Sequence, residues 1–279
     1  MPPSLSLPHA RLIRKLESVT RLTDDEKSAL GRLPLHLRKL KARDDIGSEG
    51  DQPSYCCLLI EGMLHRYKSL PDGTKAVLAY HIPGEIPDLQ TLFLQTLDHS
   101  IGAVTDCQVA MIPHIALHEV IEARPTVMAA LWRETLIDAA IFQEWIVNAG
   151  SRPARPRLAH LFCELFDRLR SVGLANRDGF TLPMTQVELG HATGMSAVHL
   201  NRIMQELRAG GLIASEGNFL HILDWPKLQE TTGYESRYLH LNTSEYGSEA
   251  NIEASPNVVR PLGLIERAVG GLEQRTPSM

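Results

Sequence analysis

The sequence predicts an α+β fold in which an N-terminal antiparallel β-barrel or jelly roll, a long dimerisation helix and a C-terminal winged helix-turn-helix follow one another. Turn glycines recur every 11 or 12 residues from Gly50 to Gly84. Residues 126–149 contain neither glycine nor proline, and residues 185–213 carry the signals of two short linked helices. The predicted divisions are 1–124 for N-terminal helices and barrel, 125–150 for the long helix, 151–230 for the winged helix-turn-helix and 242–279 for a disordered tail.

Composition limits the class of protein. With 43% hydrophobic and 22% charged residues, no apolar run long enough to span a bilayer and no signal peptide at the N-terminus, we expect a cytoplasmic protein without a membrane partner. The net charge of −5 argues against nonspecific coating of nucleic acid but leaves room for a local DNA-binding surface. The four cysteines show no CxxC spacing, so we expect buried, reduced thiols.

Residues 1–40 are predicted to be helical. The segment from Thr23 to Glu26 has the spacing of a capping box, and the apolar residues Ala29, Leu30 and Leu33 follow it. Beyond Arg43 the pattern changes to runs of strand length, "YCCLLI", "MLHRYKSL" and "AVLAYHI", each bounded by a turn signal. The turn "PDG" at 71–73 predicts a hairpin.

Two more strands are predicted at Ser100–Val104 and Gln108–Ile112, so the β-domain ends near Pro113.

The long helix carries two apolar stripes at spacings of three and four, one through Val127 and Ile141 and one through Met128 and Ile146. A helix that is apolar on two faces must pack against apolar surfaces on two sides. One side can pack on the barrel, and a second copy of the same helix is the simplest partner for the other. A helix wholly buried in one subunit is the alternative. The residues predicted to form the dimer helix contact are Leu131, Trp132, Thr135, Ala139, Phe142 and Ile146. The basic stretch at 150–157 is interpreted as a hinge.

Residues 185–213 predict the helix-turn-helix. Thr185 and Glu188 have capping-box spacing, Gly190 leaves room for a crossing helix, Gly194 suits a positive φ in the turn, and Ser196 caps the second helix.

On that second helix Leu200, Ile203 and Leu207 form a buried stripe, and Val198 and Arg202 lie on the opposite face. The hairpin at 213–223 predicts a wing, with Asp224 capping a last helix. The alternative is an ordinary helical hairpin.

The barrel, long helix and winged helix-turn-helix, in this order over about residues 15–230, resemble the Crp/Fnr family of bacterial transcription regulators. The turns "EGD" (49–51), "EG" (61–62), "PDG" (71–73) and "PGE" (83–85) match its cyclic-nucleotide-binding pattern, and "TQVELGHATGMSAVHLNRIMQELRAGGLI" matches its DNA-binding signature. The resemblance implies a homodimer that reads a roughly palindromic operator in double-stranded DNA. RNA polymerase is a further candidate partner.

The family's cyclic-nucleotide contacts are replaced in this sequence. Asp88 and Leu89 stand where the resemblance places a Gly-Glu pair, and "QTLDHSIGAV" has no arginine for the phosphate. A buried phosphate without a cation is costly, which disfavours cyclic AMP. No cofactor is predicted, and residues 1–40 hold no cysteine cluster for oxygen sensing. The candidate pocket for an unidentified small-molecule effector comprises Glu85, Asp88, Asp98, His99 and Ser100.

In the recognition helix, the family's guanine-reading basic residue matches Arg202, and Val198 replaces the family's cytosine-reading glutamate. A valine packs on a thymine methyl, so we expect a different operator. The helix N-termini suit phosphates. The predicted DNA-binding residues are Thr185, Gln186, Ser196, Ala197, Val198, His199, Asn201, Arg202 and Gln205.

Other functions find less support in the sequence. No nucleophile–base constellation or phosphate loop is present, so we predict no enzyme and no catalytic residue. His114, His118 and Glu122 share a helix face, but a metal site needs more convergence, and none is predicted. Two alternatives stay open: a cyclic-nucleotide-responsive regulator with atypical pocket contacts, and a ligand-responsive module that controls a protein partner.

Overall fold

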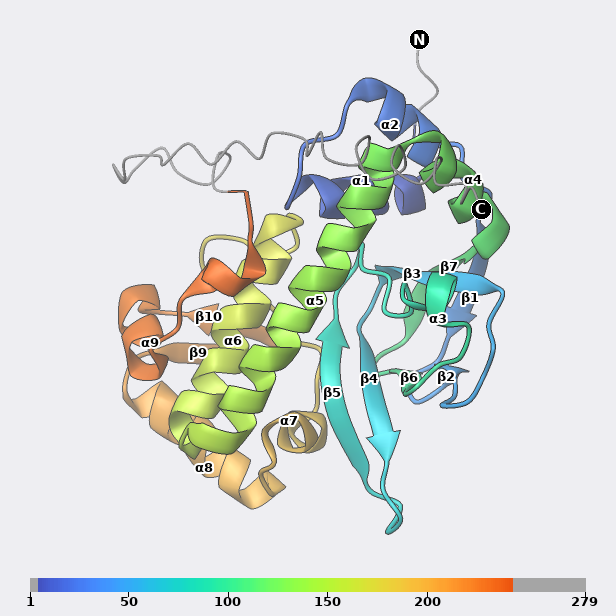
Figure 1. Cartoon of the computed structure of the whole chain (residues 1–279). Coiled ribbons are helices and arrows are strands. Elements are labelled where there is room, and N and C mark those ends of the chain that lie inside the picture. Colours follow the sequence, from blue (N-terminus) through green and yellow to red (C-terminus); the bar gives the residue numbers. More distant parts are fainter. Residues whose placement is uncertain (1–4, 243–279) are drawn as a thin grey trace, which may run out of the picture. The chain divides into compact units, whose positions relative to one another are not determined.

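The computed structural model describes residues 5–242 (Figure 1). The tail predicted over 242–279 therefore lies outside the described residues, except for Asn242. Within the described range, no helix has the length and apolarity needed to cross a membrane.

Two helices open the described chain, α1 (Leu7–Glu17) and α2 (Asp24–Leu30). The predicted capping box at Thr23 is confirmed, because its hydroxyl accepts from the Glu26 backbone N–H at 3.3 Å and the Glu26 carboxylate accepts from the Thr23 N–H at 2.6 Å.

The prediction of helix through residue 40 was wrong, since His36–Leu40 forms strand β1. Pro34 disfavours a helix here. The hydrogen-bonding edge of β7 (Cys107–Pro113), some 70 residues later, pairs with this segment.

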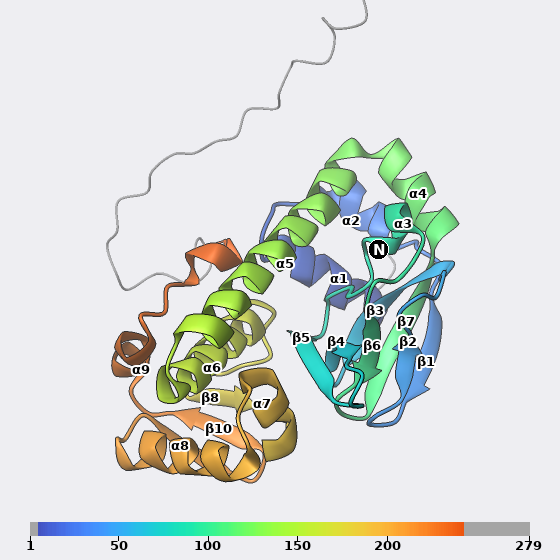
Figure 2. The same ribbon diagram turned by 60° about the horizontal axis from the view of Figure 1, so that its bottom comes forward.

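The β-domain consists of two antiparallel sheets (Figure 2). The first has the order β1–β7–β3, with β3 at Tyr55–Glu61. The second has the order β2–β6–β4–β5, with these strands at Asp45–Gly47, Ser100–Ala103, Leu64–Ser69 and Lys75–His81. Within the described residues, the two sheets of the β-domain do not join into a closed barrel, which favours the jelly-roll form of the prediction.

The core of the β-domain is formed by inward-facing residues of both sheets, among them Leu59, Leu64, Ile101 and Val109. A short helix, α3 (Thr91–Leu94), follows β5, and α4 (His114–Ala123) follows β7.

The long helix α5 spans Pro125–Ser151 and is followed by α6 (Ala154–Ser171), so the linker between them is only Arg152 and Pro153. One predicted stripe of α5 is buried within the chain, as Val127 and Ile141 show. The other is exposed from Trp132 onward, so the alternative of a helix wholly buried in one subunit is wrong. The large exposed apolar side chains of α5 are Trp132, Phe142 and Ile146 of this stripe, together with Leu136 and Val147 beside it.

The C-terminal part is a winged helix-turn-helix on α6. Helix α8 (Ala197–Ala209) contacts strand β9 of a small sheet of order β8–β10–β9, and α7 (Gln186–Thr193) contacts α8, α6 and strand β5. The strands of this sheet are β8 (Gly179–Thr181), β9 (Ile213–Glu216) and β10 (Phe219–Ile222). Helix α9 (Trp225–Thr232) and the 3₁₀ turn η1 (Ser236–Leu239) complete the described chain.

Candidate DNA-binding surface and sensory site

The helix-turn-helix is held by the local signals that the sequence predicts. The Thr185 hydroxyl accepts from the Glu188 N–H at 3.3 Å, and the Glu188 carboxylate accepts from the Thr185 N–H at 2.6 Å. Ser196 caps α8 by accepting from the His199 N–H at 3.3 Å. Both caps fix where the two helices begin, and so fix the turn between them.

The turn requires both of its glycines. Gly194 has φ +64°, a conformation that side chains with a Cβ rarely adopt. A Cβ on Gly190 would lie 2.6 Å from the Met195 carbonyl oxygen. The close approach predicted at Gly190 is therefore confirmed, but its partner differs from the prediction. We expected the second helix to lie against Gly190, whereas the structure places the backbone of the turn there.

Helix α8 separates a buried face from an exposed one as predicted. Leu200, Ile203 and Leu207 are buried, whereas Val198 is 84% exposed. The Arg202 side chain is 68% exposed and lies 3.8 Å from Glu206, a contact too long and too solvated to hold it. Arg202 is therefore free to extend from the helix.

The other residues predicted to bind DNA surround this face. Thr185, Gln186, Ser196, Ala197 and Gln205 are exposed, and His199 and Asn201 are half-buried. They lie at the N-terminus of α7 and along α8 from its N-cap to Gln205.

The wing has its predicted form, with β9 and β10 joined through Gly217 and Asn218. The Asp224 carboxylate caps α9 by accepting from the Lys227 N–H at 3.0 Å.

Arg157 anchors this surface, and the sequence reasoning missed it. Its guanidinium donates to the Thr193 carbonyl at 2.8 Å and to the Arg152 carbonyl at 2.9 Å, so it joins the end of α7 to α6 and to the α5–α6 linker. The basic stretch at 150–157 was interpreted only as a hinge. Most of it is helical, and Arg157 fixes its orientation.

The five residues predicted for the effector pocket do not converge, and that prediction was wrong as a single site. Glu85 lies in a buried charge cluster beside α1 and α6, whereas Asp88 lines a separate pocket of about 320 Å³ with Asp51 and Tyr55. The reason is that Glu85 and Asp88, only three residues apart, occupy a loop that turns between them, so their side chains enter different parts of the core.

The Asp88 carboxyl group accepts a hydrogen bond from the backbone of strand β3. Both of its carboxylate oxygens accept from the Cys57 N–H, at 2.8 and 3.1 Å. Burial raises the pKa of Asp88 to about 7. Asp98 and His99 pair with each other at 2.6 Å, and the Ser100 hydroxyl accepts from the Glu49 N–H at 3.1 Å.

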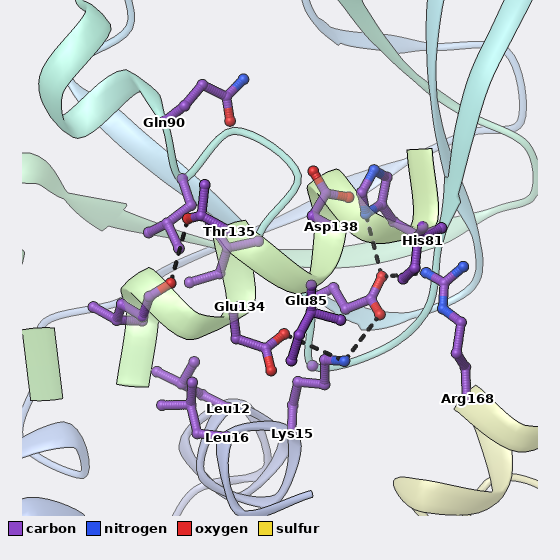
Figure 3. Close-up of a pocket in the computed structure, with 16 residues that line it drawn as sticks. Leu12, Lys15, Leu16, His81, Glu85, Gln90, Glu134, Thr135, Asp138 and Arg168 are labelled. Carbon is purple, nitrogen blue, oxygen red and sulfur yellow. Dashed lines mark hydrogen bonds and ion pairs between the residues drawn. The ribbon is translucent and has the colours of Figure 1, made fainter. Parts of the chain in front are cut away.

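The charge cluster around Glu85 joins four elements (Figure 3). Its carboxylate lies 3.2 Å from Lys15 of α1, 3.2 Å from His81 of β5 and 2.8 Å from Arg168 of α6. Lys15 also reaches Glu134 of α5 at 3.3 Å. Burial opposes ionisation of Glu85, but the charges of Arg168 and Lys15 outweigh it and hold its pKa well below the ordinary value. The adjacent cavity, about 50 Å³, has room for a few water molecules.

A larger groove, about 410 Å³, lies between α3 and α5. Its walls include Phe93, Leu94, Leu131, Trp132 and Thr135, and it is nearly all apolar.

The groove continues the exposed stripe of α5. Leu131, however, is only 3% exposed and packs in the core of its own chain, so the prediction that it faces a partner was wrong. Its neighbour Leu136, which was not predicted, is 54% exposed.

The histidines considered for a metal are dispersed. The His114 ring lies 3.2 Å from the Thr91 hydroxyl, and His118 packs edge-on against Phe93. Among residues 5–242, no group of three or more His, Cys, Asp or Glu side chains is arranged to hold a metal ion.

A jelly-roll domain, a long helix with an exposed apolar stripe and a winged helix-turn-helix with an exposed second helix together define a DNA-binding regulator with a separate β-domain. Residues 37–124 match the model of the cyclic nucleotide-binding domain, and residues 156–231 match the model of the Crp-like helix-turn-helix domain.

Curated relatives agree with this class. The transcriptional activator protein Anr of Pseudomonas aeruginosa is 25% identical over 203 residues, which is 73% of this chain and 83% of the relative. The transcriptional activator protein FnrL of Cereibacter sphaeroides is 23% identical over 228 residues, 80% of this chain and 91% of the relative. The solved structure of FixK2 from Bradyrhizobium japonicum has a TM-score of 0.64 at 21% identity, covering 71% of this chain and 98% of that one.

The chain therefore belongs to the Crp/Fnr family of transcription regulators.

Proposed function

We propose that this DNA-binding transcription regulator acts as a cytoplasmic homodimer that binds a near-palindromic operator through one α8 helix per half-site. The observation that carries the proposal is the unobstructed face of α8. Val198 and Arg202 extend from it into solvent, while the opposite face is fixed in the core. The relatives are named activators, so we extend the proposal to contact with RNA polymerase. No enzymatic activity is proposed.

The second copy is proposed from the exposed side of α5. Trp132, Leu136, Ala139 and Ile146 follow one another at spacings of four, three and seven residues, which is the repeat of a coiled-coil seam. A stripe of this size on a single soluble chain favours a partner surface. Because a symmetric dimer pairs the same stripe on both copies, two recognition helices are presented in a twofold arrangement.

Readout of bases is proposed for Arg202, whose guanidinium can donate two hydrogen bonds to a guanine. Val198 cannot accept a hydrogen bond from a cytosine, but it can pack on a thymine methyl. Thr185, Gln186 and Ser196 lie at helix N-termini, where backbone N–H groups and the helix dipole favour phosphates.

We propose that the effector is not a cyclic nucleotide. The loop that would contact one holds the buried carboxylate of Asp88, which repels a phosphate. The nearby cation, Arg66, is already paired with Asp138 of α5. Calorimetry with cyclic AMP and cyclic GMP tests this, and we expect no heat of binding at millimolar nucleotide. Saturable heat would instead favour a cyclic-nucleotide-responsive regulator with atypical contacts.

The proposed function is tested by selecting bound sites from a random DNA library with the purified full-length protein, together with sedimentation analysis. We expect a dimer and an enriched site with twofold symmetry. Enrichment of no sequence would contradict the proposal and favour a module that controls a protein partner.

A further inference from the structure

The segment that follows α9 lies outside both family matches, which end at residues 124 and 231. Residues 234–242, here called the C-terminal brace, include η1 and run beside α6 and α5 (orange to red in Figures 1 and 2). The brace contains two buried residues, Tyr234 and Leu239. These two buried side chains hold the brace against the rest of the fold.

The brace binds α6 through its two tyrosines. The Tyr234 hydroxyl donates to the Asp167 carboxylate at 3.0 Å, and the Tyr238 hydroxyl donates to the Glu164 carboxylate at 3.0 Å. Both rings pack on His160, with ring centroids at 5.2 and 6.1 Å. The DNA-binding domain is thereby tied to the brace along two turns of α6.

The brace also reaches α5 and α1. Leu239 is 1% exposed and packs in a small core with Val19, Ile137 and Ile141. At its end, Asn242 donates from its backbone N–H to the Ser18 carbonyl at 2.8 Å and from its side chain to the Glu17 carbonyl at 2.9 Å. One short segment therefore contacts the DNA-binding domain, the long helix and the N-terminal helix.

Glu164 is the residue at which these contacts meet. Its side chain is fully buried and accepts from Trp145 of α5 at 3.1 and 3.2 Å, from Arg168 at 3.0 Å and from Tyr238 of the brace. A buried carboxylate is tolerated only with such partners, so displacing any one of them is costly. Glu164 thus fixes α6 against α5 at a point about two to three helical turns from the two-residue linker at Arg152 and Pro153.

We propose that Glu164, Trp145 and Tyr238 are positioning residues that set the angle between α5 and the DNA-binding domain, and that the C-terminal brace locks this angle. The inference rests on the proposed dimeric operator binding. In a dimer built on α5, this angle sets the distance between the two recognition helices. The brace therefore determines which spacing of half-sites the protein accepts.

Half-site spacing is a sensitive readout of this angle. Each inserted base pair moves one half-site by about 3.4 Å and rotates it by about a tenth of a turn. A rigid dimer binds an operator of the wrong spacing with lower affinity. A dimer whose DNA-binding domains can change their angle to α5 loses less affinity. A variant that is merely less stable weakens binding equally at every spacing, so the two effects are separable.

The test compares full-length wild type with Tyr238→Phe and Leu239→Ala on operators whose spacer is changed by −1, +1 or +2 base pairs. We expect wild type to lose about tenfold or more in affinity for each changed spacer. The variants should lose threefold or less. Arg237→Ala is the matched control, because this neighbouring side chain is 85% exposed and pairs only with Glu235 in the described chain. It should retain the wild-type preference.

A second measurement reads the angle without DNA. Spin labels on α5 at Ala129 and on α8 at Gln205, in labelled chains diluted with unlabelled ones, report the distribution of distances between the two helices. We expect one narrow distribution for wild type and Arg237→Ala and a broad one for Tyr238→Phe and Leu239→Ala. Unchanged distributions in both brace variants overturn the inference.

The two measurements also separate the inference from the function on which it rests. If wild type binds no operator, the proposed function fails, and the label distances still decide whether the brace sets the angle. If wild type prefers one spacing and the brace variants keep that preference at equal loss of affinity, the brace inference fails while the proposed function stands.

Discussion

Glu85 of the β-domain and Arg168 of α6 form a buried ion pair, 2.8 Å between the closest atoms, with side chains 9% and 4% exposed. The Arg168 guanidinium also donates to the Tyr80 carbonyl at 2.8 Å and to Glu164 at 3.0 Å. The pair joins the β-domain directly to the first helix of the DNA-binding domain. Breaking it removes one of the buried ion-pair partners of each side chain, so the pair stabilises the contact between the two domains.

The first prediction concerns this pair. Arg168→Met leaves the Glu164 carboxylate buried without a cation and removes one of the two cations beside Glu85, which keeps Lys15. We expect a loss of about 3 to 5 kcal/mol in the free energy of unfolding. Urea denaturation measures it. Lys41→Met is the control, because its pair with Asp106 is exposed and should contribute nothing measurable. Equal stabilities for Arg168→Met and wild type would show that the pair does not hold the domains together.

The second prediction concerns pH and Asp88. Burial raises its pKa to about 7 in the folded protein, above the ordinary value of 3.8. The folded protein therefore keeps a proton that the unfolded chain releases, and wild type loses stability as pH rises from about 4 to about 7. Asp88→Asn cannot ionise, so its stability relative to wild type should rise over this range, by at most about 1.4 kcal/mol per pH unit. Parallel stability profiles for the two proteins would contradict the prediction.

The third prediction concerns the turn of the helix-turn-helix. Gly194→Ala places a Cβ at φ +64°, and we expect a loss of about 1 to 2 kcal/mol. Gly150→Ala is the matched control, since Gly150 lies near the end of α5 with open space around it and should gain up to about 1 kcal/mol. Thermal unfolding of both variants measures the difference. A neutral Gly194→Ala would mean that the turn does not need a left-handed residue.

The fourth prediction concerns the dimer. Trp132→Glu puts a charge at the first residue of the exposed stripe of α5, and burying it against a second copy is costly. We expect the variant to sediment as a monomer at micromolar concentration, where wild type is a dimer. Ile115→Glu, at a large apolar residue of α4 that is also exposed, serves as control and should leave the dimer intact. A dimeric Trp132→Glu would place the interface elsewhere.

The features that could be predicted from the sequence depend on neighbours within a few residues. The caps at Thr23, Thr185 and Ser196 and the positive φ of Gly194 belong to this group, because a cap or a turn is completed locally. Strand β1 could not be predicted in this way, since its partner β7 is far along the chain.

The residues of the candidate DNA-binding and effector sites could likewise be predicted only where they depend on near neighbours in the sequence. The exposed face of α8 follows from helical periodicity alone, and Arg202 lies on it as expected. The residues proposed for the effector pocket were chosen by proximity in sequence, and the loop from 84 to 90 separates them. Arg157 and Glu164 act through partners on other elements, so no local pattern identifies them.

The central claim is that Arg202 reads a base from the exposed face of α8. Its most direct test is the affinity of wild type and Arg202→Ala for the selected operator and for operators with each half-site guanine replaced. We expect wild type to lose about 1 to 3 kcal/mol when one particular guanine is replaced, which is about fivefold or more in affinity. Arg202→Ala should bind the selected operator and that altered operator with equal affinity. Arg38→Ala, an exposed arginine of β1, should behave as wild type. If Arg202→Ala keeps the full preference for that guanine, Arg202 does not read it and the claim is contradicted.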